Sequence, residues 1–174
     1  MTAASAAALV EMVANLTLGK KGYEDVAKLM ESIKEQARDL RIRYLAGIAE
    51  DAAAFDGVIR AVRLPKDTPN RKDIVQQAFK EAAEIPFSLG KDIFVLVQLA
   101  EQTVRYGNKW VITDGAIAAM NARSAMRSAF YSVRVNLQSI TDEQYVRDMT
   151  EAIQRIEREA ALLEQRVERE YERR

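Results

Sequence analysis

Cysteine and histidine are both missing from the 174 residues of this sequence. Without cysteine the chain can form no disulfide, no thiolate nucleophile and no zinc–thiolate or iron–sulfur site. Without histidine it can form no Ser-His-Asp triad and offers no imidazole ligand to a metal. Any acid–base chemistry therefore has to use Asp, Glu, Lys, Tyr or bound water.

An excess of charge of one sign is missing as well, because 26 Lys and Arg residues balance 26 Asp and Glu residues. Nucleic-acid-binding domains usually carry a basic excess, so the balance argues against such a partner. The densest apolar stretch, residues 93–100, is much shorter than the roughly 20 residues that cross a membrane. No basic segment precedes the Ala-rich N-terminus, so we expect no signal peptide and a cytoplasmic protein without a membrane partner.

Glycine and proline are scarce, with 7 and 3 residues, whereas Ala, Glu, Arg, Leu and Val are abundant. This composition is typical of helical proteins. The length fits one domain over residues 1–174, which is large enough to bury a core without disulfides or metals. We therefore predict an all-α fold: a multi-helix bundle with long amphipathic helices.

The hydrophobic periodicity and the breakers predict where the helices lie. A first helix covers residues 3–16 and has its C-terminal cap at Gly19. A long amphipathic helix then runs to about Val62, where the segment LPKDTPN ends it. Thr68 is predicted to cap the next helix, with Pro69 at its first position.

Proline 86 is expected to end or kink this third helix, and a very apolar helix follows over residues 87–106, central in the bundle. Thr113 or Asp114 is predicted to cap the next one. A Thr141–Gln144 capping box is predicted to begin the last helix. The last helix carries a heptad seam that packs along the bundle or against a second chain: Val146, Met149, Ile153, Ile156, Ala160, Leu163 and Val167.

Four polar clusters could carry chemistry, and each has a purely structural alternative. Lys20 and Lys21 lie between glycines just after a helix and could bind an anion, but cations also favour helix C-termini. Asp51 lies among alanines; if it faces inward, its raised pKa suits a general acid or base. Otherwise it lies on an exposed helix face.

The other two clusters follow prolines or helix ends. Lys66 stands in a proline-flanked loop as a possible charge for an anionic ligand, or as an ordinary exposed lysine. In GNKWVITDG, residues 107–115, Asn108 offers amide donors and Asp114 a carboxylate. Asp114 could equally be an N-cap that needs no ligand.

Taken in order, several stretches resemble the cyclodeaminase/cyclohydrolase family of folate enzymes. They are ALVEMVANLTLGKKGY (8–23), EDAAAFDGVIRAVRLPKDT (50–68), EAAEIPFSL (81–89), GNKWVITDGAIAAM (107–120) and RSAFYSVRVNLQSITDE (127–143). The family includes bacterial methenyltetrahydrofolate cyclohydrolase and the C-terminal domain of formiminotransferase-cyclodeaminase.

The resemblance implies an all-helical homodimer with a folate site in a cleft near the subunit contact. It implies hydrolysis of 5,10-methenyltetrahydrofolate to 10-formyltetrahydrofolate, or the related cyclodeaminase reaction, in which 5-formiminotetrahydrofolate closes to the methenyl compound and releases ammonia. A free-standing domain favours the cyclohydrolase. The folate is substrate, and neither a cofactor nor a metal is expected.

The resemblance also suggests roles for individual residues. Asp114 is the leading candidate to hold water or a ring nitrogen, and Asp51 is the second. The lysines would bind the glutamate carboxylates of the folate tail or stabilise developing charge: Lys20, Lys21 and Lys66. A tyrosine and three asparagines would orient the pterin by hydrogen bonds: Tyr23, Asn15, Asn108 and Asn136.

Two departures from the family pattern support a third possibility. The family has a PTPGGG-like stretch before its first helix, whereas this chain opens at MTAASAAAL. Ser132 stands where the family pattern has Asn. A Gly-rich loop lets backbone N–H groups approach a ligand closely. The alternative to an enzyme is therefore a catalytically silent helical paralogue that binds folate or a protein partner.

Overall fold

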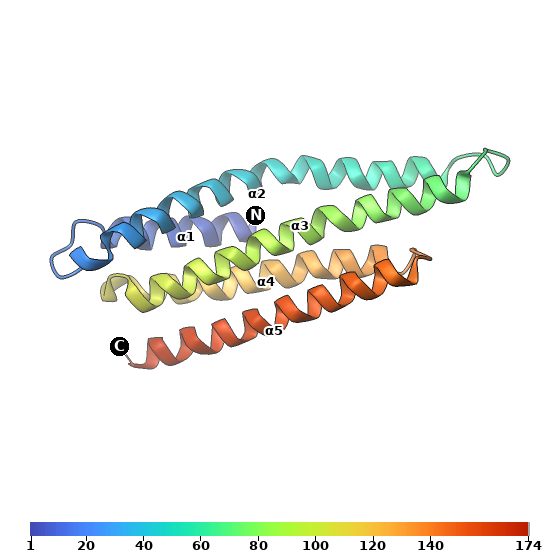
Figure 1. The fold of residues 1–174 in the computed structure, drawn as a ribbon. Helices are drawn as coiled ribbons and strands as arrows, with labels where there is room; N and C mark the ends of the chain where they lie inside the picture. Colours follow the sequence, from blue (N-terminus) through green and yellow to red (C-terminus); the bar gives the residue numbers. More distant parts are fainter. Residues whose placement is uncertain (174) are drawn as a thin grey trace.

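The computed structural model is an all-helical bundle, as the composition predicts (Figure 1). It describes residues 1–173, apart from the side chains of residues 47–52 and 54. The helices are α1 (Thr2–Thr17), η1 (Glu24–Val26), α2 (Ala27–Val62), α3 (Arg71–Tyr106), η2 (Lys109–Val111), α4 (Ile112–Leu137) and α5 (Glu143–Arg173).

The long helices run up and down, so their connections gather at two ends of the bundle (Figure 1). We call residues 18–26 and 107–111 the first end, and residues 63–70 and 138–142 the second end. Helices α2 and α3 have 36 residues each, or about 54 Å of helix. Helix α1 has only 16, so it covers α2 and α3 over only part of their length.

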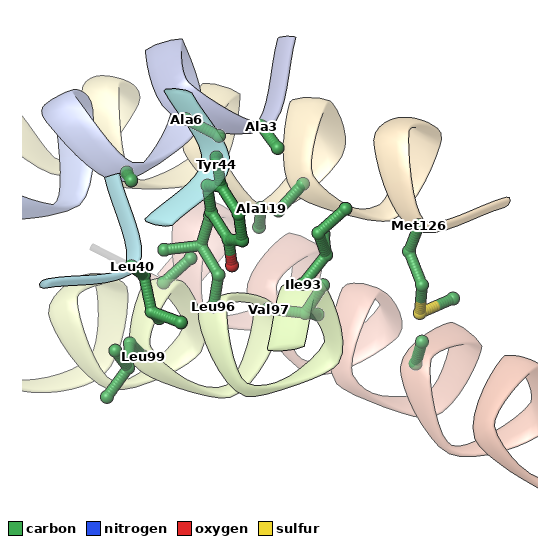
Figure 2. Packing of buried hydrophobic residues seen from close by; sticks show 14 of the residues in the cluster. Ala3, Ala6, Leu40, Tyr44, Ile93, Leu96, Val97, Leu99, Ala119 and Met126 are labelled. Atoms are coloured by element: carbon green, nitrogen blue, oxygen red, sulfur yellow. The ribbon is translucent and has the colours of Figure 1, made fainter. Parts of the chain in front are cut away.

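Helix α3 is central, because it packs against α1, α2, α4 and α5. Its apolar segment supplies Ile93, Leu96 and Val97 to the core (Figure 2), which confirms the central position predicted for it. Helix α4 approaches α3 closely: a Cβ added to Gly90 would lie only 2.3 Å from the ring of Phe130. Only glycine fits at that crossing.

The seam of α5 faces the inside of this same chain. Met149, Ile153, Ile156, Ala160 and Val167 are buried, and Val146 and Leu163 pack against them. Helix α5 contacts α3 and α4, so the seam packs along the bundle. Across the described residues, no helix is long and apolar enough to cross a membrane.

Several predicted helix ends are confirmed. Helix α1 ends at Thr17, and Gly19 follows with φ of +71°, the left-handed conformation that suits a residue after the C-cap. Helix α2 runs to Val62 and α3 to Tyr106, with Gly107 as its C-cap.

The predicted end of a helix at Pro86 is wrong, because α3 continues through it, whereas the alternative, a kink, stays a prediction. Proline removes the N–H that would bond the carbonyl four residues earlier, here that of Ala82. The side-chain amide of Asn136 on α4 donates to this carbonyl at 2.9 Å. A neighbouring helix thus supplies the missing donor, and the helix is preserved.

The predicted cap at Thr68 and Pro69 is also wrong. Helix α3 begins at Arg71, after Asn70 in the left-handed region. The guanidinium of Arg71 donates to the carbonyls of Val62 and Leu64. The loop is thus folded back on the end of α2, and this delays the start of α3.

The observed N-caps of α4 and α5 differ from the predicted ones by a few residues. Helix α4 begins at Ile112, so Thr113 and Asp114 lie inside its first turn. Helix α5 is capped by Asp142, whose carboxylate accepts from the N–H of Tyr145 at 3.1 Å, rather than by Thr141. The backbone N–H and hydroxyl of Thr141 are engaged by Gln76 on α3.

Candidate functional site

At the first end, Asn108 joins the end of α1 to the start of η2. Its side-chain amide donates to the Leu16 carbonyl at 2.9 Å, and its side-chain oxygen accepts from the Trp110 N–H at 3.1 Å. Its backbone N–H donates to the buried hydroxyl of Thr17 at 2.9 Å. Asn108 is only 3% exposed, so its amide groups are engaged within the protein.

Tyr23 makes a second connection at the first end, because its hydroxyl accepts from the Lys109 N–H at 3.0 Å. The loop holding Lys20 and Lys21 is thereby fixed beside η2, and both lysines are exposed. Asn15, near the end of α1, is exposed too. Lys20 and Lys21 could receive an anion there, and the exposed carboxylates of Glu24 and Asp25 follow them in η1.

Asp114 lies half-buried in the first turn of α4, close to η2 in the sequence. The structure therefore places six of the predicted residues at or near the first end: Asn15, Lys20, Lys21, Tyr23, Asn108 and Asp114. The side chains of Asn108 and Tyr23 bond the backbone there, and the lysines and Asp114 are the groups that could face a ligand.

The remaining predicted residues lie elsewhere. Lys66 is exposed in the loop of the second end. Asn136 lies near the end of α4, where its amide nitrogen donates to the carbonyls of Ala82 and Ser132. The side chain of Asp51 lies outside the described residues, but its position on α2 is five residues past Ala46.

A cavity of about 840 Å³ opens at the N-terminus of α1, between the first and second ends of the bundle. This volume is typical of sites for small molecules. Its apolar wall comes from α2, α3 and α4: Tyr44, Pro86, Leu89, Ile93, Ala125 and Ala129. The serines of the wall are Ser88, Ser128 and Ser132. An apolar wall with a few polar groups is typical of pockets that bind small organic ligands.

Charged groups line the same cavity. Arg43 forms an ion pair of 3.0 Å with Asp92. The buried hydroxyl of Tyr44 donates to the Asp92 carbonyl at 3.0 Å. Burial, together with the Asp92 carboxylate, raises the pKa of Tyr44 well above its ordinary value. Tyr44 therefore stays protonated and joins α2 to α3 under the cavity.

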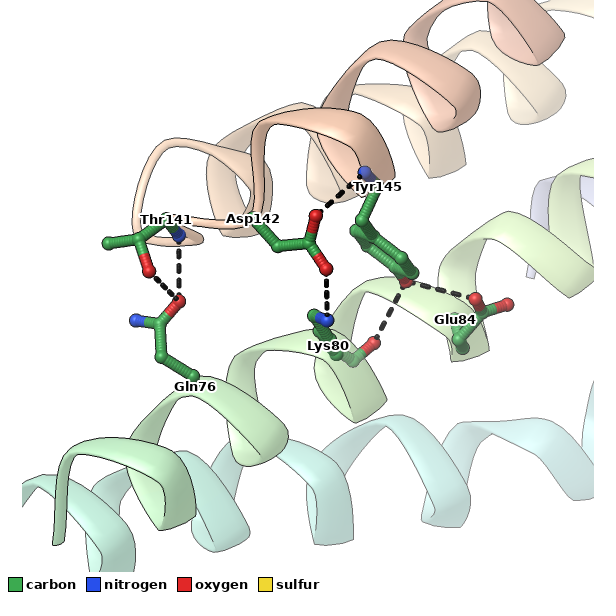
Figure 3. Close-up of polar contacts among 6 residues, drawn as sticks. All are labelled: Gln76, Lys80, Glu84, Thr141, Asp142 and Tyr145. Carbon is green, nitrogen blue, oxygen red and sulfur yellow. Dashed lines mark hydrogen bonds and ion pairs between the residues drawn. The ribbon is translucent and has the colours of Figure 1, made fainter. Parts of the chain in front are cut away.

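Glu84 also lines the cavity, and the sequence reading did not single it out. Its carboxylate accepts from the Tyr145 hydroxyl at 2.9 Å (Figure 3). Burial and the neighbouring carboxylate of Glu84 raise the pKa of Tyr145 well above its ordinary value. The available signal was spacing: Glu84 stands two residues before Pro86 in EAAEIPF, on the turn that faces the capped start of α5.

The predicted site is thus divided within one chain. Ser128 and Tyr44 both line the cavity. Asp114 lies 14 residues before Ser128 on α4, toward the first end, whereas Asp51 lies 7 residues after Tyr44 on α2, toward the second end. At about 1.5 Å per residue, the backbone positions of Asp114 and Asp51 are roughly 30 Å apart along the bundle. They cannot both reach one reacting carbon of a substrate bound to one chain. In the described part of the chain, no cluster of acidic residues could hold a metal ion.

Comparison with known proteins gives the same family from sequence and from structure. Residues 1–155 match the sequence profile of the formiminotransferase-cyclodeaminase family. A methenyltetrahydrofolate cyclohydrolase from Methylorubrum extorquens is 33% identical over 96% of this chain and 82% of its own length. The formimidoyltransferase-cyclodeaminase of Sus scrofa is 27% identical over 91% of this chain, but over only 30% of its own length.

A solved structure agrees in fold. The crystal structure of formiminotetrahydrofolate cyclodeaminase from Thermotoga maritima matches with a TM-score of 0.91 and 32% identity. The match covers 98% of this chain and 83% of that one. By its sequence and its helical architecture, therefore, the chain belongs to the formiminotransferase-cyclodeaminase family.

Proposed function

We propose that this chain hydrolyses 5,10-methenyltetrahydrofolate to 10-formyltetrahydrofolate. The observation that carries the proposal is its 33% identity with a cyclohydrolase over 82% of that enzyme. The same chain spans only about a third of the formimidoyltransferase-cyclodeaminases that it resembles. These relatives also match at the lower identities of 27% and 29%.

The reaction needs proton transfer at a carbon that is already electrophilic. The oxygen of water bonds to the cationic bridge carbon between N5 and N10, and a base accepts one proton from it. The tetrahedral carbon then loses its bond to N5, which takes up a proton, while its hydroxyl gives up the second proton of the water and becomes the carbonyl of the formyl group on N10. One proton is released overall. A carboxylate and bound water can perform these transfers without a cofactor.

We place the substrate in the cavity at the N-terminus of α1. Its volume and apolar wall suit a pterin ring, and Asp51 is the candidate base on the same helix as Tyr44. Asp114, Lys20 and Lys21 lie at the first end of the same chain. They act on this substrate when a second chain brings its first end to the cavity, so the proposal includes a homodimer.

Exposed apolar side chains on α2 support such a subunit contact. Ile42, Leu45, Phe55 and Val62 are exposed by 55%, 48%, 64% and 45%. Large apolar groups repeated along one helix are typical of surfaces that pair with another chain. In the dimer, the folate tail would meet the lysines of the partner.

The test is the loss of near-UV absorbance of 5,10-methenyltetrahydrofolate on adding purified protein, measured against its spontaneous hydrolysis. We expect acceleration by the wild type and losses of about 100-fold or more in Asp51→Asn and in Asp114→Asn. Lys109→Ala, an exposed change at the first end, is the control and should keep its activity. Normal turnover in both aspartate variants would overturn the assignment of roles.

Mixing the two inactive variants tests the shared site. A heterodimer of Asp51→Asn and Asp114→Asn holds one site with both native carboxylates, so mixing should restore part of the activity. If each chain works alone, the mixture stays inactive. Size-exclusion chromatography of each variant shows whether the dimer is intact.

The cyclodeaminase reaction is the second candidate, because the solved structure with a TM-score of 0.91 is a formiminotetrahydrofolate cyclodeaminase. Ammonia release from 5-formiminotetrahydrofolate distinguishes the two. Ammonia release that exceeds methenyl hydrolysis would favour the deaminase. Binding of folate without either reaction would favour the silent paralogue.

A further inference from the structure

The charged groups of the cavity differ in how they are neutralised. Asp92 is paired with Arg43, and the ammonium of Lys91 lies over the Phe87 ring, 4.7 Å from its centre. The partner of Glu84 is a neutral hydroxyl, and no ion pair engages it among the described residues. Glu84 therefore brings a negative charge to the cavity that a ligand can use.

The start of α5 holds Glu84 in place (Figure 3). The capping carboxylate of Asp142 accepts a hydrogen bond from the Tyr145 N–H, and the same carboxylate forms an ion pair of 2.7 Å with Lys80. The Lys80 ammonium lies 5.0 Å from the centre of the Tyr145 ring. With its ring fixed, Tyr145 directs its hydroxyl to one oxygen of Glu84.

A carboxylate has about four acceptor positions, and Tyr145 uses one of them. The remaining positions can accept two parallel N–H donors from a planar group, as carboxylates do from arginine. The 2-amino-4-oxo edge of a reduced pterin offers such a pair, the ring N3–H and the 2-amino group. The apolar cavity wall beside Glu84 suits the flat face of the same ring.

We infer that Glu84 recognises the amino-pyrimidinone edge of the folate in the cavity, and that Tyr145 is its positioning residue. This inference rests on the proposed function for the identity of the ligand. It assigns Glu84 to binding rather than to proton transfer at the bridge carbon, which lies at the opposite side of the pterin from this edge.

The first test is a binding measurement that does not depend on turnover. Isothermal titration calorimetry with 5-formyltetrahydrofolate should show affinity about 10- to 100-fold weaker in Glu84→Gln, because a charged hydrogen-bond pair is lost. Tyr145→Phe should lose about 3- to 10-fold. The matched controls, Glu159→Gln on the exposed face of α5 and Tyr131→Phe on α4, should bind as the wild type does.

A second ligand separates recognition from folding. A folate analogue without the 2-amino group should bind the wild type weakly, and Glu84→Gln and Tyr145→Phe should weaken it little further. Equal losses for both ligands, or unchanged binding in Glu84→Gln, would overturn the inference. Thermal unfolding of each variant shows whether the bundle is intact.

Kinetics then separates this inference from the proposed function. If the wild type hydrolyses methenyltetrahydrofolate, Glu84→Gln should raise KM and leave kcat within a few-fold, whereas a loss confined to kcat would make Glu84 a proton-transfer group and overturn the inference. If the wild type is inactive but binds folate through Glu84, the proposed function fails while the inference stands.

Discussion

The side-chain amide of Asn136 donates a 2.9 Å hydrogen bond to the carbonyl of Ala82. That carbonyl is the one that Pro86 leaves without its helical donor. Helix α4 thus completes the backbone of α3 beside the cavity, and the turn that carries Glu84 keeps its direction. Asn136, predicted to orient a ligand, therefore has a structural role in the helix that lines the cavity.

Replacing Asn136 by Ala should therefore destabilise the fold. The Ala82 carbonyl would lose its donor, at a cost of about 1–3 kcal/mol in the free energy of unfolding. Urea denaturation measures this change, and Asn15→Ala on the exposed face of α1 is the matched control, expected within about 0.5 kcal/mol of the wild type. Equal stability of the two variants would show that Asn136 is not a structural donor.

The close crossing of α3 and α4 predicts a large effect of Gly90→Ala. The added Cβ would lie 2.3 Å from the Phe130 ring, which is fully buried, so the variant should lose about 1–3 kcal/mol. Gly57→Ala is the control, because its Cβ would have only an arginine nitrogen at 3.9 Å. It should be neutral or more stable by up to about 1 kcal/mol.

A double variant tests the mechanism of that loss. The double variant Gly90→Ala/Phe130→Leu replaces the ring by a smaller side chain, which makes room for the new methyl group. Its loss of unfolding free energy should therefore be smaller than the sum of the losses in the two single variants. Additive losses in thermal unfolding would mean that the two residues do not clash.

Asn108→Ala should loosen the first end. The variant leaves the Leu16 carbonyl and the Trp110 N–H without their side-chain partner, and we expect a loss of about 1–3 kcal/mol. Hydrogen exchange should speed up at the start of η2 and the end of α1. Lys20→Ala, which changes an exposed side chain of the same end, should leave stability and exchange unchanged.

Much of the helical framework could be predicted, because apolar spacing records which face is buried. The stripe of α2, the central position of residues 93–97 and the seam of α5 all agree with the structure. The wrong predictions at Pro86 and at the start of α3 concern side-chain contacts that apolar spacing does not record. Asn136 preserves the helix at Pro86, and Arg71 reaches back to Val62 and Leu64.

The candidate site shows the same limit. The polar residues of GKKGY and GNKW were singled out, but tertiary contacts use Tyr23 and Asn108 to join the two loops. No short motif marks Glu84, because the contact that sets it apart is a hydrogen bond from Tyr145, 61 residues away. Short motifs identify residues that matter without saying whether the backbone or a ligand is their partner.

The N-cap of α5 gives a prediction about pH. The hydrogen bond from Lys80, and then the N–H of Tyr145, hold the pKa of Asp142 below its ordinary value of 3.8. A carboxyl with a lowered pKa in the folded state stabilises the fold above its unfolded pKa. That contribution is lost as the pH falls through the folded pKa.

Asp142→Asn isolates this charge, because asparagine keeps a side-chain oxygen that can cap the helix. The wild type should be more stable than the variant at neutral pH, and the difference in urea midpoint should shrink below the ordinary pKa of aspartate. In a Lys80→Met background the difference should be smaller and depend less on pH, since the largest cause of the shift is absent. A constant difference across this range would mean that Asp142 acts through the neutral cap alone. The charge would then have no part in holding Tyr145 beside Glu84.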